Sequence, residues 1–264
     1  MTPDTGDGRP PRLHLAADGC ATITLQRPRH RHRLHREDLR ALQAQFAEAA
    51  ADPTVHLLVL TATGPVFCAG FHLGELEASS AQDAASEDPR LFEHTVDALE
   101  ALPLPTIVRL NGSVYGGATD LALACDFRVG VAGMELRMPA ARLGLHYYPR
   151  GLQRYVTRLG LQAAKRLFLL AEAVPAEELL RMGYLDELVA ADALDATVQR
   201  LAGALEAGAP LALRGMKQSL NEIARGDDNP APVLERMARC AASADLREGL
   251  AAFASRRPPR FTGR

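Results

Sequence analysis

The sequence predicts an α/β fold with layered sheets, followed by a helical C-terminal region. Three observations indicate this. Between residues 13 and 138, apolar and amphipathic stretches recur in the order strand, strand, helix. After Pro149, long amphipathic helical patterns dominate. A Gly116-Gly117 pair lies between an apolar strand, 106–110, and an apolar helical run, 121–125, which is a place for close backbone approach to a ligand.

The elements of the first part are expected in the following order. Residues 13–15 and 21–25 form a hairpin that turns at Asp18-Gly19. Residues 75–87 are small, polar and acidic, which predicts a mobile loop or a frayed helix. Helices are expected over 37–51 and 89–102, and strands over 55–60, 66–73, 106–110, 126–131 and 135–138.

The helical region is expected to pack against the core or against other subunits, because its apolar faces need burial. One short strand, 184–189, interrupts it. The predicted helices cover 150–158, 161–170, 175–182, 192–207, 210–225 and 231–254. The chain is therefore divided into a flexible N-terminal tail, 1–12, an α/β core, 13–200, and a helical C-terminal region, 201–264.

Composition narrows the function classes. The 264 residues carry a net charge of −2 and only 5% aromatic side chains, which argues against nucleic-acid binding. No run approaches the roughly 18 apolar residues of a membrane span, and no signal-peptide pattern is present. The four cysteines are widely spaced, which indicates neither a zinc site nor a disulfide framework. A soluble, cytoplasmic protein is expected.

The stretch from Asn111 to Asp120 is the strongest candidate site. Bare N–H groups at a Gly-Gly turn before a helix suit an anion, or an oxygen that becomes one. If the helix begins at Gly117, the Asp120 carboxylate shares a face with the Gly117 N–H. A donor to an oxyanion and a candidate proton carrier then lie side by side.

Several further sequence segments occur in a characteristic order and spacing. They include Gly64-Pro-Val-Phe-Cys-Ala-Gly-Phe-His-Leu73, Pro105 to Gly112 running into Gly116-Gly117, Met182 to Leu188 and the terminal Phe261 to Arg264. With these pieces the chain resembles the crotonase superfamily, the enoyl-CoA hydratases and isomerases, over nearly its whole length.

The resemblance implies a spiral of ββα units with a helical C-terminal trimerisation region, and a homotrimer or a hexamer made of two trimers. It implies an acyl-CoA thioester substrate of fatty acid metabolism and no cofactor beyond coenzyme A. By position, the backbone N–H groups of Phe71 and Gly117 form an oxyanion hole for the thioester oxygen. Ala69, Gly70 and Gly116, which flank these groups, are expected to contact the bound substrate. A preorganised pair of donors stabilises an enolate by several kcal/mol.

The acid/base set departs from the pattern of hydratases in this family. The first carboxylate position holds Asp120, and the second, after Pro139, holds Ala140. Hydration uses two such groups, so isomerase, decarboxylase and hydrolase chemistry stand beside it. Replacements are sought in the loop 145–151, where His146, Tyr147 and Tyr148 are candidate proton carriers or donors. Arg150 could pair with a substrate carboxylate, or simply neutralise a helix or subunit contact.

The basic loop from Arg27 to Arg33 has the family's position for contacts to the phosphates of CoA. Arg27, Arg29 and Arg31 are the candidates, because guanidinium groups suit phosphates; a solvated charge run is the other interpretation. Two function classes remain open. One is an enzyme that acts through a thioester enolate, and the other is a catalytically degenerate CoA-binding or scaffold protein of the same fold.

Overall fold

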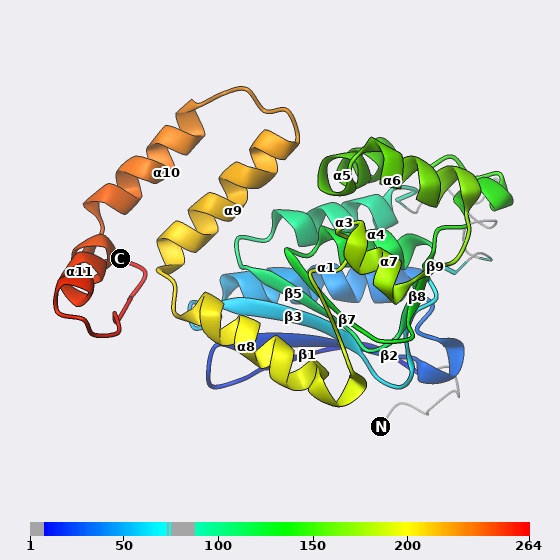
Figure 1. Ribbon diagram of the computed structural model, residues 1–264, viewed down its shortest axis with the longest axis horizontal. Coiled ribbons are helices and arrows are strands. Elements are labelled where there is room, and N and C mark those ends of the chain that lie inside the picture. Colours follow the sequence, from blue (N-terminus) through cyan, green and yellow to red (C-terminus); the bar gives the residue numbers. More distant parts are fainter. Residues whose placement is uncertain (1–7, 73, 75–87) are drawn as a thin grey trace.

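The computed structural model describes residues 8–72, 74 and 88–264 of the chain. Two β-sheets lie at its centre and helices cover them (Figure 1). This arrangement confirms the predicted α/β class. The expectation of a mobile loop or frayed helix over 75–87 and most of the expected tail, residues 1–7, lie outside the described residues.

The larger sheet has six strands in the order β1-β2-β3-β5-β7-β10. β1 and β2 form the antiparallel hairpin, and all later neighbours are parallel. In β3 the four residues from Leu57 to Leu60 are all buried, as expected for a parallel strand with both faces covered. The strands span Arg9–Leu15 (β1), Cys20–Gln26 (β2), Leu57–Ala62 (β3), Thr106–Leu110 (β5), Phe127–Val131 (β7) and Glu187–Val189 (β10).

The smaller sheet has four short strands in the order β4-β6-β8-β9. Its first three strands run parallel, so their C-terminal ends lie at the same edge. This edge is where the candidate site forms. The strands span Val66–Cys68 (β4), Ser113–Tyr115 (β6), Glu135–Arg137 (β8) and Val174–Pro175 (β9).

Ten α-helices of the described residues carry the labels in Figure 1. Within this part of the chain, none is both long and apolar enough to cross a membrane. Their bounds are Arg36–Ala51 (α1), Leu91–Ala101 (α3), Gly117–Ala124 (α4), Pro149–Leu159 (α5), Leu161–Lys165 (α6), Ala176–Arg181 (α7), Leu194–Glu206 (α8), Pro210–Ala224 (α9), Ala231–Ala242 (α10) and Ala244–Ala254 (α11).

Several expected elements differ in their bounds. β1 begins at Arg9, so the chain is already in the sheet within the segment expected to be tail. The expected helix over 161–170 changes at Arg166 into a π-helical turn, Arg166–Leu170, which is followed by Ala171 with a φ of 48°. The single helix expected over 231–254 is two helices. Ser243 divides them, because its hydroxyl accepts a hydrogen bond from the Leu246 N–H and so caps the start of α11.

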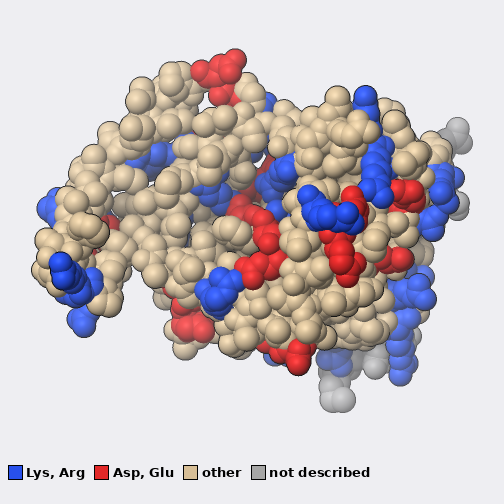
Figure 2. All heavy atoms as spheres, viewed as in Figure 1, with Lys and Arg blue, Asp and Glu red and all other residues tan. Residues whose placement is uncertain are grey.

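The last three helices, α9 to α11, stand apart from the sheets as an arm (Figure 1). Their surface is mostly uncharged in the view of Figure 2. Lys217 and Asn221 of α9 attach the arm to the core through the carbonyl oxygens of Leu104 and Glu100. The expected boundary after residue 200 falls inside α8, which contacts the large sheet, so the arm begins one helix later.

Candidate active site

Two backbone segments meet at the edge of the smaller sheet. One follows β4 and contains Gly70 and Phe71, and the other joins β6 to α4 and contains Gly116 and Gly117. Gly70 has a φ of +91°, and a Cβ there would lie 2.8 Å from the Tyr115 carbonyl oxygen and 3.2 Å from the Gly117 nitrogen. The segments approach this closely because Gly70 has no side chain and tolerates the left-handed backbone.

The N–H groups of Phe71 and Gly117 donate no hydrogen bond to any residue that the structure describes. At Phe71 this follows from its parallel bridge with Leu34: the Leu34 N–H donates to the Gly70 oxygen, and the His72 N–H donates to the Leu34 oxygen. Gly117 is the first residue of α4, and the first N–H groups of a helix have no acceptor within the helix. Both groups are available to an acceptor, as the oxyanion-hole interpretation requires.

Both N–H groups belong to residues that line a cavity of about 370 Å³. Most of its exposed lining is apolar. Its charged lining residues are Arg36, Arg90 and Glu93, and the loop 145–148 contributes the polar side chains of His146, Tyr147 and Tyr148. Besides Phe71 and Gly117, the predicted site residues that line it are Ala69, Gly116, His146, Tyr147 and Tyr148. An apolar cavity with a few convergent polar groups is the usual form of a small-molecule site.

The Phe92 ring of α3 covers Gly117. A Cβ at Gly117 would lie 2.6 Å from the Phe92 Cζ, so any side chain here would collide with the ring. Glycine is needed for space and not for its backbone conformation, since the φ of Gly117 lies outside the left-handed region. The ring lies 6.2 Å from those of both Phe71 and Tyr148, edge-on to the latter. An aromatic wall therefore joins the two sides of the cavity.

Asp120 lies behind this wall, fully buried. Its Oδ2 accepts hydrogen bonds from the hydroxyls of Tyr148 and, at 3.1 Å, Tyr147, and its Oδ1 lies 2.8 Å from Nη1 of Arg154. The Asp120 carboxylate thus has three partners, two of which are tyrosines of the loop 145–151. Burial raises the pKa of both tyrosines, and the neighbouring carboxylate raises it further, so the phenols stay protonated as donors.

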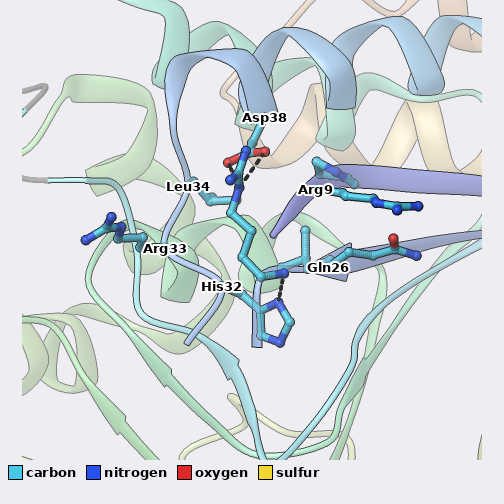
Figure 3. Close-up of a pocket in the computed structure, with 9 residues that line it drawn as sticks. Arg9, Gln26, His32, Arg33, Leu34 and Asp38 are labelled. Carbon is cyan, nitrogen blue, oxygen red and sulfur yellow. Dashed lines mark hydrogen bonds and ion pairs between the residues drawn. The ribbon is translucent and has the colours of Figure 1, made fainter. Parts of the chain in front are cut away.

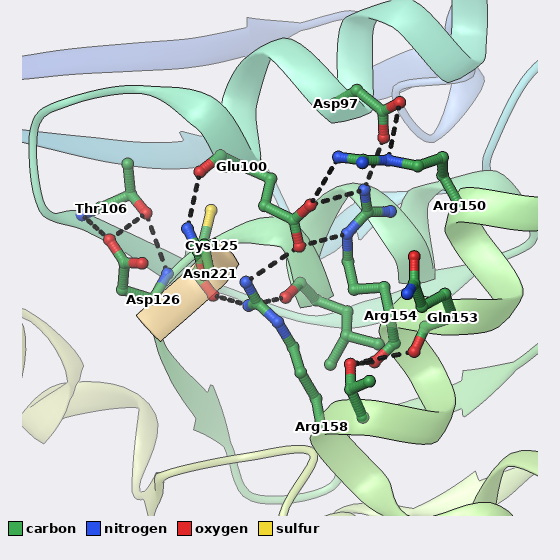
Figure 4. A network of polar contacts seen from close by, with 12 residues as sticks. Asp97, Glu100, Thr106, Cys125, Asp126, Arg150, Gln153, Arg154, Arg158 and Asn221 are labelled. Carbon is green, nitrogen blue, oxygen red and sulfur yellow. Dashed lines mark hydrogen bonds and ion pairs between the residues drawn. The ribbon is translucent and has the colours of Figure 1, made fainter. Parts of the chain in front are cut away.

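Arg154 also belongs to a larger ionic cluster between α3 and α5 (Figure 4). Its Nε lies 2.9 Å from Glu100 Oε1 and its Nη2 lies 2.7 Å from Asp97 Oδ1. Burial alone raises the pKa of Glu100, but Arg154, Arg158 and Arg150 outweigh it and the net shift is downward. The Glu100 carboxylate is therefore charged and compensated by guanidinium groups.

Arg150 is directed to this cluster and does not line the cavity. Its guanidinium lies 3.3 Å from Asp97 Oδ2 and 3.4 Å from Glu100 Oε2 (Figure 4). Ala140 does line the cavity and is almost fully buried. The position of the second carboxylate is thus inside the site, with a methyl group in place of a charge.

His146 is exposed and lines the cavity. Its Nδ1 lies 2.9 Å from the Tyr147 carbonyl oxygen. Since a carbonyl oxygen only accepts, Nδ1 carries the proton, and Nε2 of the neutral ring has a free lone pair. Among the described residues, Nε2 has no hydrogen-bond partner.

The basic loop is bonded to the segment that leads to Phe71. The Ala69 N–H donates to the Arg31 oxygen at 2.8 Å, and the Cys68 thiol donates to the His32 oxygen at 2.9 Å. Arg27 is buried and paired with Asp38 at 3.1 Å, whose side chain Figure 3 shows beside the loop. Arg29 and Arg31 are exposed, and they remain the loop's candidates for phosphate contact.

Comparisons with known proteins decide the family. The family model described as enoyl-CoA hydratase/isomerase matches residues 16–264. This chain belongs to the enoyl-CoA hydratase/isomerase family. The chain is 32% identical to an enoyl-CoA isomerase/hydratase of Mycosarcoma maydis, over 95% of this chain and 97% of that one. It is 30% identical to a crotonyl-CoA hydratase of Syntrophomonas wolfei, over 91% and 94%.

A solved structure of a similar protein has the same fold as this enoyl-CoA hydratase/isomerase family member. An enoyl-CoA hydratase/carnithine racemase from Magnetospirillum magneticum superposes with a TM-score of 0.86 at 28% identity, covering 96% of this chain and 97% of that one. The predicted crotonase family and fold are confirmed. The ionic cluster is the part that sequence reasoning missed. Arginines at 150, 154 and 158, four residues apart on one amphipathic helix, were the available signal.

Proposed function

We propose that the protein transforms acyl-CoA thioesters by stabilising a thioester enolate between the N–H groups of Phe71 and Gly117. The observation that carries the proposal is the pair of backbone donors at the wall of the apolar cavity that bond to none of the described residues. An enolate has its negative charge on the thioester oxygen, where fixed donors shielded from water act most strongly. Coenzyme A enters as part of the substrate, and no step calls on a further cofactor.

We assign the proton transfer to His146. Its Nε2 lone pair is available at the cavity, whereas Asp120 is enclosed by Arg154 and two phenols. With Ala140 at the second position, one proton carrier fits a 1,3 proton shift. His146 takes a proton from the carbon next to the thioester, the hole holds the enolate, and the same proton returns at the far end of the conjugated system. A double-bond isomerisation is therefore favoured over hydration.

Phosphates of the CoA part are assigned to Arg29 and Arg31. Both are exposed, and the loop that carries them is bonded to the segment before Phe71. Arg27 is engaged with Asp38 and acts instead to hold the loop. The thioester and the phosphates would then bind to one continuous piece of structure.

Enolate formation is tested by the exchange of α-protons of a simple saturated thioester with solvent. This test does not require that the natural acyl group be known. The protein is incubated with butyryl-CoA in D₂O, and deuterium at the α-carbon is measured by mass spectrometry. Crotonyl-CoA, 3-enoyl-CoA and malonyl-type CoA esters are followed in parallel for products. We expect exchange in the wild type and strong loss in His146→Gln. Equal exchange in the variant would remove His146 from the mechanism.

A binding or scaffold protein is the second candidate, and Asp120 motivates it. Its charge is neutralised by Arg154 at 2.8 Å, and Ala140 supplies no replacement. Titration with butyryl-CoA by calorimetry separates the two. Tight binding without exchange or product in any arm supports the scaffold, whereas exchange excludes it.

The arm supports the proposal of a homotrimer, or of two such trimers. Met216, Leu220 and Ile223 of α9, and Leu246, Leu250 and Phe253 of α11, form exposed stripes at helical spacing, with Phe253 87% exposed. We expect Leu250→Glu to dissociate the assembly in sedimentation velocity, and Arg247→Ala on the same helix to leave it unchanged. A monomeric wild type would refute the assembly. A cytoplasmic location is proposed with it.

A further inference from the structure

Three carboxylates and three guanidinium groups meet between α3, α4 and α5. The acids are Asp97, Glu100 and Asp120, and the bases are Arg150, Arg154 and Arg158. Arg154 is the base that contacts all three acids, and it is almost fully buried. The count of charges balances only while all six are ionised. Such a cluster holds its members in one geometry, because an uncompensated buried charge is costly.

We infer that Arg154 is a positioning residue of the active site, which keeps Asp120 as a fixed anion that orients Tyr147 and Tyr148. In this arrangement Asp120 carries no proton during turnover. It accepts from both phenols through Oδ2 while Oδ1 faces Arg154. The inference rests on the proposed function in one respect, namely that the two phenols line the acyl-CoA cavity.

The packing around the carboxylate supports this role. A Cβ at Gly151 would lie 2.4 Å from Tyr147 Cε1 and 2.8 Å from Asp120 Oδ2, so the first turn of α5 closes tightly over both groups. The two phenol rings lie 4.6 Å apart. Since each hydroxyl donates its only hydrogen to Asp120, each presents oxygen lone pairs to other ligands. The phenols therefore offer acceptors toward a substrate hydroxyl or a water.

Loss of Arg154 changes the charge state of Asp120. In Arg154→Gln a buried carboxylate would lose its countercharge, and uptake of a proton would neutralise it. A protonated Asp120 becomes a donor through one oxygen, and its neutral carboxyl group is a weaker acceptor for the two phenols than the anion. The orientation of the phenols at the cavity would then change.

Infrared spectroscopy of the ligand-free protein at neutral pH tests this directly. We expect no protonated-carboxyl stretch from Asp120 in the wild type, as judged by difference from Asp120→Asn. We expect the band in Arg154→Gln, its loss in the double variant with Asp120→Asn, and its absence in Arg154→Lys. Arg158→Gln is the matched control, because Arg158 lies one turn later and contacts Glu100 but not Asp120; no Asp120 band is expected there.

The band in the wild type, its absence in folded Arg154→Gln, or its appearance in Arg158→Gln would each overturn the inference. The wild-type measurement decides even if Arg154→Gln does not fold. Proton exchange on butyryl-CoA provides the second readout. We expect Arg154→Gln to lose about tenfold or more, equivalent to about 1.4 kcal/mol, and Arg154→Lys to recover part of it. Adding Tyr148→Phe to Arg154→Gln should cost nothing further, and additive losses would contradict the role.

The two proposals fail in different ways. If the wild type exchanges no proton, the proposed enzymatic function falls, while the infrared result still decides the role of Arg154. If exchange occurs and Asp120 is found protonated in the wild type, the enzymatic proposal stands and the positioning role falls.

Discussion

Replacing Gly117 by alanine perturbs the oxyanion hole through one neighbour. The new Cβ would lie 2.6 Å from the Phe92 Cζ, whereas carbon atoms pack at about 3.5 Å, so ring and backbone must separate by about 0.9 Å. A shift of that size at a reacting group costs about 10²-fold, and loss of one hole donor costs about 10²–10³-fold. We expect Gly117→Ala to slow butyryl-CoA proton exchange by about 10²–10³-fold and to lower the free energy of unfolding by about 1–3 kcal/mol.

Two variants test whether the Phe92 ring displaces the Gly117 N–H. Phe92→Leu in the Gly117→Ala background removes the ring carbon that the methyl meets, so most of the lost exchange should return. Gly203→Ala is the matched control, because outside the backbone of α8 itself no atom of the described residues lies within 4 Å of the added Cβ, and it should stabilise α8 by about 0.5–1 kcal/mol. Unchanged exchange in folded Gly117→Ala, or no recovery in the double variant, would refute the displacement of the Gly117 N–H.

Three further outcomes concern stability. Burial lowers the pKa of His32 below its ordinary 6.5. As the pH drops below about 6.5, the unfolded chain therefore binds the proton first and the stability of the fold falls. Between pH 7.5 and 5.5 the melting temperature of His32→Gln should fall less than that of the wild type, and an equal fall would contradict this. Ser243→Ala removes the cap to the Leu246 N–H and should cost about 1 kcal/mol in denaturant unfolding, with no change sinking the assignment. Asp245 accepts from the Thr262 N–H at 2.7 Å, so Asp245→Ala should release the C-terminus to carboxypeptidase, and equal resistance would refute this contact.

Backbone features of the site were predictable because they depend on short stretches. The Gly116-Gly117 pair, the strand before it and the helix after it predicted where the backbone turns into α4 at the cavity. β5 has the predicted bounds, and α4 begins at Gly117. Glycine and strand patterns act through local sterics, which adjacent residues determine. The break at Ser243 was missed because helical periodicity continues across it, and a cap is visible only when the chain leaves the helix.

The partners of the charged side chains could not be predicted from the sequence. Asp120 was a candidate proton carrier by its position, yet its partners lie 27, 28 and 34 residues further along the chain. Arg27 and Arg150 were candidates for ligand contact, and the fold directs both to carboxylates of its own. The chain by itself determined the class of fold, the family and the place of the backbone donors. Only the tertiary structure decided which charged side chains pair. The partners lie on elements that are far apart in the sequence, and local sequence patterns do not show how such elements pack together.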